Sequence, residues 1–220
     1  MEEHEHHLLL VFEKLREHQL YVKREKCAFA QQQINFFGHV IEAGKVGMEE
    51  EKVKAIKEWK TPSLVIEVRS FLGLANYYQR FVKGFSKRAE PLAELLNKRN
   101  KWSWTSRCQE AFDNFKNAMM EGPVLGIADM KKPFEVETDA SDFALEGVLL
   151  QEGHPIAYES QKLKEAERRY AASEKEILAI VHCLQSWRQY LLGAKFVVKI
   201  DNSSICHFFD QPKLSSKQAC

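Results

Sequence analysis

The chain has 220 residues, of which 45% are hydrophobic and 14 are phenylalanine, so it is long and apolar enough to bury the cores of one or two domains. Its 32 basic and 31 acidic residues give a formal net charge of +1, so nothing in the total charge indicates a polybasic tail or a strongly acidic chain, and any affinity for nucleic acid must be local. No apolar run reaches the roughly 18 residues of a membrane span, and the polar amino terminus is unlike a signal peptide. We therefore expect no membrane contact and an intracellular location, cytoplasmic or nuclear.

The cysteines indicate neither a disulfide framework nor a zinc module, because their number is odd and no two are close in sequence. They are Cys27, Cys108, Cys183, Cys206 and Cys220. Three histidines among the first seven residues are typical of a solvated helix start, although such a tract can also bind a metal ion adventitiously.

The first half of the chain is predicted to be mostly helical. Apolar residues at helical spacing predict an amphipathic helix over residues 3–18, which needs a surface to pack on. Two segments rich in β-branched and aromatic residues, 20–29 and 34–42, predict a hairpin around the polar turn at residues 31–33. Further helices are expected over three ranges, with Pro62 separating the first two. These ranges are 49–59, 65–81 and 106–121.

Near Pro123 the pattern changes to strand, strand, strand, helix, strand, so we expect a boundary at about residue 127. The strands are predicted over 134–139, 143–151, 155–160 and 195–200. The long helix is predicted over 173–192, with Ser173 and Glu176 as a capping box and Gly193 as its stop. Residues 1–125 carry 20 basic and 17 acidic residues, against 12 and 14 in residues 126–220, so the first half is the better candidate for holding phosphates.

Three carboxylates from separate elements are candidates for a metal site. Asp139 and Asp201 each end an apolar strand, and Glu176 lies in the first turn of the intervening helix. Converging carboxylates need cations to neutralise them, and hard oxygen ligands suit Mg²⁺ or Mn²⁺. Two such ions can catalyse phosphodiester hydrolysis. The alternative is that both aspartates simply end strands and that Glu176 is the reciprocal partner of the Ser173 cap.

The order and spacing of several motifs resemble gypsy-type retrotransposon polyproteins. The second half resembles their ribonuclease H domain through Asp139-Ala-Ser-Asp-Phe-Ala, Gly147-Val-Leu, Pro155-Ile-Ala-Tyr-Glu-Ser, Glu174-Lys-Glu-Ile-Leu-Ala-Ile-Val and Asp201-Asn. The first half resembles the palm end and thumb of their reverse transcriptase through Leu20-Tyr-Val-Lys-Arg-Glu-Lys-Cys27, Phe37-Gly-His-Val-Ile41, Trp59-Lys-Thr-Pro62 and Arg69-Ser-Phe-Leu-Gly-Leu-Ala-Asn-Tyr-Tyr-Gln-Arg-Phe81. The resemblance covers nearly the whole chain.

The resemblance implies an α+β and α/β fold in three parts. These are a reverse transcriptase palm-end hairpin (1–48), a helical thumb with connecting helices (49–126) and a ribonuclease H-like mixed-sheet domain (127–220), truncated at both ends. Within the sheet, the first three strands should be antiparallel, and the fourth should be reached through the long helix.

By the same resemblance, Asp139, Glu176 and Asp201 are catalytic metal ligands for two Mg²⁺ (or Mn²⁺) ions. The family's fourth acidic ligand would follow Cys220, and its polymerase motif, Tyr-x-Asp-Asp, does not occur in this sequence. The implied activity is RNA-directed DNA synthesis with metal-dependent hydrolysis of RNA in RNA–DNA hybrids, impaired here by these two gaps. The implied partners are a hybrid or template–primer duplex and the remaining polyprotein, namely fingers, palm and integrase. The alternatives are a non-catalytic nucleic-acid-binding remnant and a relic reading frame.

The nucleic-acid-binding residues are expected on one helix face and one turn. Arg69, Gly73 and Tyr77 fall at i, i+4 and i+8 with Asn76 beside them, and by resemblance they form the minor-groove track of the thumb. The segment Phe37-Gly38-His39 occupies the place of the primer grip. The alternative is that Tyr77 is a core residue and Arg69 is merely solvated, while Phe71, Leu74, Tyr78 and Phe81 form the core face.

Three residues depart from the family pattern. Glu146 replaces a usual glycine, Ile200 replaces a usual threonine, and Arg88 replaces an apolar residue. A glycine within a strand often permits close approach of backbone or ligand, so Glu146 bears directly on the candidate site.

Overall fold

The computed structural model describes residues 2–97, 101–122 and 124–200. The amino-terminal half contains α1 (Glu2–Glu17), η1 (Arg24–Lys26), β1 (Gln33–Phe36), β2 (His39–Glu42), β3 (Lys45–Met48), α2 (Glu50–Lys57), α3 (Val65–Tyr77), η2 (Gln79–Phe81), α4 (Phe85–Glu94), α5 (Ser106–Met120) and β4 (Leu125–Gly126). The carboxy-terminal half contains β5 (Phe134–Ala140), β6 (Ala144–Gln151), β7 (His154–Lys162), η3 (Glu167–Arg169), α6 (Ala172–Ser186), α7 (Arg188–Leu191) and β8 (Phe196–Ile200). Within the described residues, no helix has the length and apolar character needed to cross a membrane.

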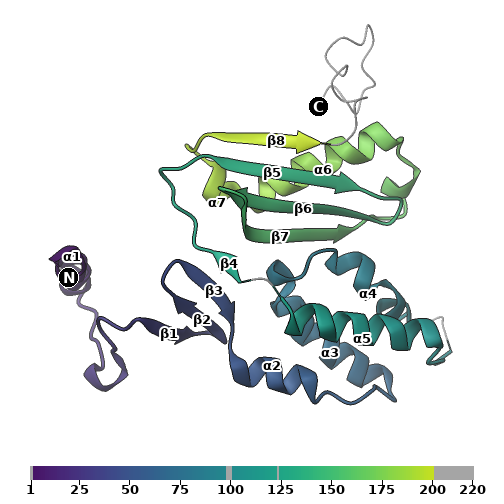
Figure 1. Ribbon diagram of the computed structural model, residues 1–220, viewed down its shortest axis with the longest axis horizontal. Helices are drawn as coiled ribbons and strands as arrows, with labels where there is room; N and C mark the ends of the chain where they lie inside the picture. Colours follow the sequence, from purple (N-terminus) through teal and green to yellow (C-terminus); the bar gives the residue numbers. More distant parts are fainter. Residues whose placement is uncertain (1, 98–100, 123, 201–220) are drawn as a thin grey trace, which may run out of the picture.

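Two four-stranded sheets organise the chain (Figure 1). The first is antiparallel with the order β1-β2-β3-β4, and β4 reaches it from the far end of the helical region. The second has the order β7-β6-β5-β8, in which β5, β6 and β7 pair antiparallel and β8 pairs parallel with β5. The prediction of a mixed sheet whose fourth strand follows a helix is therefore confirmed. The domain boundaries expected near residues 48 and 126 stay predictions.

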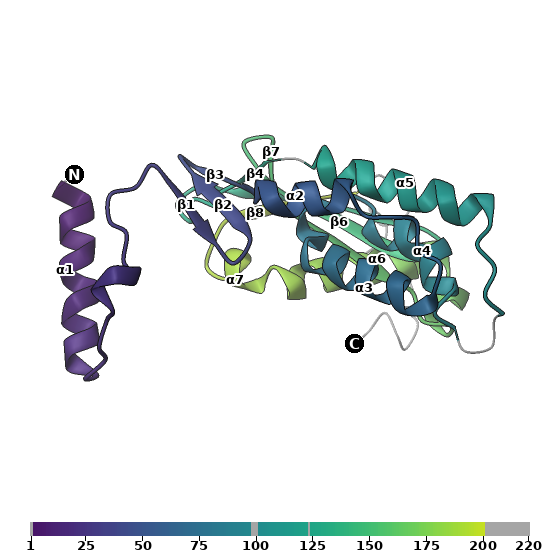
Figure 2. The same ribbon diagram turned by 90° about the horizontal axis from the view of Figure 1, so that it is seen from below.

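Separate hydrophobic cores lie under the two halves. Helices α2 to α5 enclose an aromatic core in which Phe71, Phe112 and Phe115 are almost completely buried. The expected core face of α3 is confirmed, because Phe71, Tyr78 and Phe81 are buried and Leu74 packs against the same core. The second core lies between the sheet and α6, which covers one face of the sheet (Figures 1 and 2).

The predicted hairpin around residues 31–33 is wrong. The hairpin is formed instead by β1 and β2 around Phe37 and Gly38, which both have positive φ angles, 47° and 72°. Two such residues match the twist of a two-residue hairpin loop. Residues 20–29 contain only the short helix η1, so their β-branched and aromatic composition did not produce a strand.

Two helix predictions also need correction. The helix α4 was not predicted, and it contains Pro91, a residue that sequence rules place outside helix interiors. The long helix begins at Ala172, and Trp187 separates α6 from α7. Its amino-terminal partner is Glu174, whose carboxylate accepts the backbone N–H of Ala171 at 3.0 Å, so the capping box of Ser173 and Glu176 is wrong.

The strand β7 joins the second sheet to the amino-terminal half (Figure 1). The buried Ser160 makes two of the contacts: its hydroxyl accepts the backbone N–H of Ser86 at 2.9 Å, and its carbonyl accepts the side-chain amide of Gln79 at 2.9 Å. Arg80 also donates to the carbonyl of Ile156 at 3.5 Å. The edge of β7 is therefore covered by η2 and the start of α4, and we call this contact the β7 seam.

Candidate functional site

Asp139 lies near the end of β5, on the face of the sheet opposite α6. Alternation along the strand buries Phe134, Val136 and Thr138 and leaves Glu137 and Asp139 exposed. Phe134 and Val136 belong to the core that also contains Cys183 and Trp187 from the region of α6. On the other side of β5, Thr138 pairs with Ile200, the last described residue of β8. Asp201, the third expected ligand, lies outside the described residues.

Glu176 lies in the second turn of α6, which packs across β5 and β6. A small hydrophobic cluster of Leu145, Leu163 and Ala179 is completed by Ala140 and Leu178. Ala140 is the neighbour of Asp139, and Ala179 lies about one helical turn after Glu176. Residues next to the two carboxylates therefore meet in one cluster, whereas the side chain of Asp139 itself points to the opposite face of the sheet. The alternative from the sequence, in which Glu176 pairs with a Ser173 cap, does not match the helix start, because the helix begins at Ala172 and Glu174 makes the cap contact.

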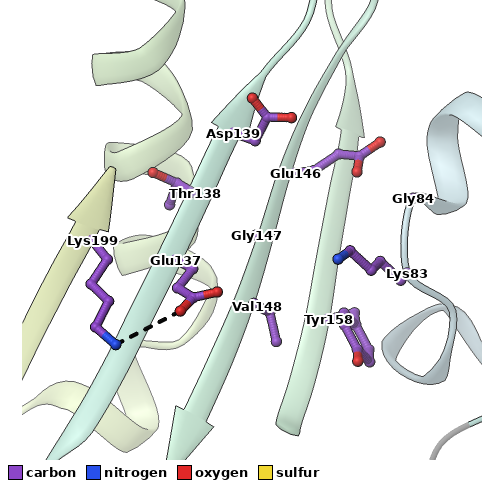
Figure 3. A pocket seen from close by; sticks show the side chains of 10 residues that line it. All are labelled: Lys83, Gly84, Glu137, Thr138, Asp139, Glu146, Gly147, Val148, Tyr158 and Lys199. Carbon is purple, nitrogen blue, oxygen red and sulfur yellow. Dashed lines mark ion pairs between the residues drawn. The ribbon is translucent and has the colours of Figure 1, made fainter. Parts of the chain in front are cut away.

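Asp139 lines a pocket of about 330 Å³ between the open face of the sheet and the loop before α4 (Figure 3). Its lining residues are Lys83, Gly84, Glu137, Thr138, Asp139, Glu146, Gly147, Val148, Tyr158 and Lys199. The ammonium group of Lys199 pairs with the carboxylate of Glu135, and its Nζ atom lies 3.8 Å from Oε1 of Glu137. The negative charge of these two glutamates is therefore balanced by Lys199, whereas the end of the pocket at Asp139 stays acidic (Figure 3).

Glu146 is the cross-strand partner of Asp139 and supplies a second carboxylate at the acidic end (Figure 3). Burial and the neighbouring Asp139 raise the pKa of Glu146, while Lys87, Lys83 and Arg88 oppose the rise. Its carboxylate also lies close to Gly84, at 3.4 Å from the position that a Cβ there would occupy. The departure from the family pattern at residue 146 thus enlarges the acidic group and brings it close to the start of α4.

The donor chemistry of the site suits a hard divalent cation, because carboxylate oxygens are the ligands that Mg²⁺ and Mn²⁺ prefer. The side chains of Asp139 and Glu176 supply such oxygens. Among residues 2–97, 101–122 and 124–200, however, no three His, Cys, Asp or Glu side chains gather closely enough to hold a metal ion. The expected three-ligand set, which includes Asp201, therefore stays a prediction.

The predicted nucleic-acid face of α3 is exposed. Arg69, Gly73, Asn76 and Tyr77 are all accessible, with Tyr77 51% exposed. The alternative that Tyr77 is a core residue is therefore wrong. Its neighbour Tyr78 takes the core position instead and is 1% exposed.

The structure brings the expected primer-grip segment against the end of α3. The hydroxyl of Tyr77 donates to the carbonyl of Phe37, and that of Tyr78 donates to the carbonyl of Gly38 at 3.0 Å. The ring of His39 stacks on Tyr77 at a centroid distance of 5.5 Å and on Phe81 at 5.4 Å. Phe37 itself is 74% exposed. The turn and the helix face are consequently joined into one surface with an aromatic tip.

Sequence reasoning missed several residues of these surfaces. Lys83, Gly84 and Lys199 line the pocket, but no motif distinguishes them. Tyr158 lies within the motif Pro155-Ile-Ala-Tyr-Glu-Ser, but it was not expected to be a site residue. The alternation of β8 was the one available signal for Lys199, since it places that residue on the face opposite Val198, which packs into the core. The role of Tyr78 in anchoring Gly38 had no sequence signal, because the two residues are 40 positions apart.

Comparisons of the sequence and of the fold with known proteins both find similarity to reverse transcriptases. Residues 104–198 match the sequence profile of the family described as "RNase H-like domain found in reverse transcriptase". The retrovirus-related Pol polyprotein from transposon 297 of Drosophila melanogaster is 38% identical over 205 residues, which cover 92% of this chain and 19% of the relative. The transposon Tf2-3 polyprotein of Schizosaccharomyces pombe is 37% identical over 195 residues, which cover 86% of this chain and 15% of the relative. The chain thus spans less than a fifth of the length of these relatives.

Solved structures of foamy viral protease-reverse transcriptase have the same fold. The complex with an RNA/DNA hybrid has a TM-score of 0.80 and 25% sequence identity, covering all of this chain and 31% of that chain. A complex with double-stranded DNA has a TM-score of 0.78 and 26% identity, covering 99% of this chain and 47% of that chain.

Proposed function

Since this chain belongs to the reverse transcriptase and ribonuclease H-like family of gypsy-type retrotransposon polyproteins, we propose that it binds RNA–DNA hybrid or template–primer duplexes and cleaves the RNA strand of a hybrid. The observation that carries the proposal is the packing of α6 on β5, in which Ala140, next to Asp139, and Ala179, about one helical turn after Glu176, belong to one hydrophobic cluster. DNA synthesis is not included, because Tyr-x-Asp-Asp does not occur in these 220 residues.

In this proposal Asp139, Glu176 and Asp201 hold two Mg²⁺ or Mn²⁺ ions. The bound cations supply the Lewis acidity that phosphodiester hydrolysis requires. The role of the chain is to position the ligands. Asp139 is held by β5, and Glu176 is held by α6, whose packing on the sheet sets the distance of Glu176 from the sheet. Glu146 adds negative charge beside Asp139, which strengthens the attraction for a cation at the acidic end of the pocket.

The duplex is held by the surface that α3 forms with the β1–β2 turn. Arg69 supplies charge, Gly73 lets a backbone approach, and Asn76 and Tyr77 supply polar and aromatic contacts. Phe37 and His39 lie at the joined turn, where the exposed Phe37 ring is available for stacking. An A-like duplex presents a wide, shallow minor groove to such a surface.

The cleavage experiment uses the purified chain with Mg²⁺ or Mn²⁺ and a hybrid labelled on its RNA strand. Asp139→Asn should abolish any cleavage that the unaltered chain shows, because it removes a metal ligand. Glu152→Gln is the control, since Glu152 is an acidic residue outside the pocket that pairs with Lys132. Equal cleavage by the unaltered chain and Asp139→Asn would contradict the proposed site.

A second candidate function is nucleic-acid binding without turnover. It is favoured by the exposed face of α3, which is fully formed without any contribution from the carboxylates. In this case the hybrid should bind, with affinity falling steeply as salt rises, but stay intact. Arg69→Ala should weaken binding and reduce by about one the slope of the logarithm of the binding constant against the logarithm of the salt concentration. Arg107→Ala is the control and should change neither quantity, because the guanidinium of Arg107 is paired with Glu90 on another face.

A further inference from the structure

A buried lysine joins the two motifs that carry the candidate metal ligands. Lys175 is 6% exposed, and its ammonium group donates to a carboxylate oxygen of Asp142 at 2.7 Å. Asp142 itself is largely accessible, with its side chain 84% exposed. The lysine comes directly before Glu176 in sequence, and the aspartate follows Asp139 by three residues. The ion pair therefore bridges the neighbourhoods of both ligands.

Asp142 projects from a tight turn between β5 and β6 that Ser141 holds together. The Ser141 hydroxyl accepts the backbone N–H groups of Phe143 and Ala144 at 3.3 and 3.0 Å, and the N–H of Ser141 donates to the carbonyl of Ala144 at 2.9 Å. Such side-chain contacts fix a local backbone conformation. The turn thus offers a rigid anchor for a side chain coming from α6.

Local helix energetics do not account for a lysine at position 175. It lies in the first turn of α6, where the partial positive charge of the helix end disfavours a cation. Burial adds a further cost for an ammonium group. The contact with Asp142 compensates for both effects, and it also lowers the pKa of that carboxyl group. Because the buried ammonium group of Lys175 is unfavourable except for its contact with Asp142, we infer that this contact has a role.

We propose that the Asp142–Lys175 ion pair positions Glu176 relative to Asp139, so that both carboxylates can bind the same cation. This inference rests on the proposed function. Asp142 and Lys175 are positioning residues in it, because they act through the turn after β5 and the first turn of α6 rather than by contact with metal. Partners that orient metal ligands typically change metal affinity by about 10–100-fold when they are altered.

The test measures Mn²⁺ affinity from the electron paramagnetic resonance signal of free Mn²⁺. Asp142→Asn should weaken Mn²⁺ binding by about 10-fold. Asp142→Glu, which keeps the charge, should restore much of the affinity. The exposed pair Lys132–Glu152, at 2.9 Å, supplies a matched control, and Glu152→Gln should leave Mn²⁺ affinity unchanged.

Lys175→Met separates positioning from simple electrostatics. It retains a long apolar side chain suited to the buried position, so the fold should persist. If Lys175 acted only through its charge, its removal would tighten the binding of a cation nearby. Positioning predicts the opposite sign, with Mn²⁺ binding several-fold weaker, and the double variant Asp142→Asn/Lys175→Met should be no weaker than the single variants.

Each outcome decides the inference. If Asp139→Asn abolishes Mn²⁺ binding while Asp142→Asn and Lys175→Met leave it unchanged or tighter, the positioning role is overturned and the proposed function stands. If the unaltered chain does not bind Mn²⁺, both are overturned. Measuring each variant well below its own thermal midpoint keeps a loss of stability from being mistaken for a loss of affinity.

Discussion

Gly147 sets how closely α6 approaches the second sheet. A Cβ at this position would overlap the Sγ atom of Cys183 and would lie 3.1 Å from the ring of Trp187. Both of these neighbours are buried, and burial raises the pKa of the Cys183 thiol to about 12, so it behaves as a neutral packing group. The position of Glu176 relative to the sheet therefore depends on the absence of a side chain at residue 147.

We expect Gly147→Ala to lower the free energy of unfolding by about 1–3 kcal/mol, because the new methyl group overpacks the core. Adding Cys183→Ala should recover part of that loss by removing the Sγ atom. Urea unfolding of the single and double variants measures both effects. Gly47→Ala is the control, since Gly47 is also in a strand but has open space around its Cα. Equal unfolding free energies for Gly147→Ala and the unaltered chain would contradict this account.

At the scale of single residues, the sequence predicts what periodicity and motifs encode. The exposed face of α3 and the buried positions of Phe71, Tyr78 and Phe81 follow from helical spacing alone. The Lys175–Asp142 ion pair does not, because it joins residues 33 positions apart through one contact. Likewise, the sequence shows a glycine at position 147, but only the close packing of Cys183 and Trp187 against it explains why a side chain would not fit there.

At the scale of elements, the β1–β2 turn is stabilised by residues far along the chain. Phe37 has a positive φ angle, which is unfavourable for a bulky side chain, and hydrogen bonds from Tyr77 and Tyr78 hold the turn in place. Local composition therefore misplaced the hairpin, since it favoured residues 20–29. The unpredicted α4 has a similar cause: Pro91 argues locally against a helix, but Ala89 and Leu92 pack into the amino-terminal core.

The docking of this turn should depend on pH. Burial, together with the positive charge of Arg80, lowers the pKa of His39 below its usual 6.5. The unfolded chain therefore binds this proton more readily than the folded chain, so stability should fall as pH drops from about 7 through 6.5 until His39 protonates in the folded state. Urea unfolding at pH 7.5 and pH 5.5 should show a smaller loss in His39→Phe than in the unaltered chain. His18→Phe, at the exposed end of α1, should keep the full loss, and identical losses in all three proteins would refute the assignment to His39.

At the scale of the whole molecule, α1 stands apart from the rest of the fold (Figure 2). Its contacts with the following segment include a hydrogen bond from Ala30 to His4 and an edge-on contact between Phe12 and Phe29. Leu9 and Val11 are 61% and 54% exposed. The sequence predicted that this helix needs a surface to pack on, and within the described residues only part of its apolar face is covered, by the segment that includes Phe29.

Removing residues 1–30 should therefore leave the thermal midpoint of the remaining chain nearly unchanged while reducing self-association, because the exposed apolar side chains are lost. Sedimentation velocity over a range of concentrations measures the association. Leu9→Lys/Phe12→Lys in the full chain is the companion variant, since it keeps the length and removes the apolar character. A large fall in thermal midpoint on deletion would show that α1 stabilises the fold.

The order in which the chain is synthesised has a consequence for the β7 seam. An edge strand with unpaired backbone groups is prone to pair with other chains, and here Gln79 and Ser86 occupy that edge. Because translation proceeds from the amino terminus, the helices that supply these two residues leave the ribosome before β7 does. A partner for the vulnerable edge is thus already present when the strand emerges, so the nascent sheet has little time in which to pair with a neighbouring chain on the same polysome.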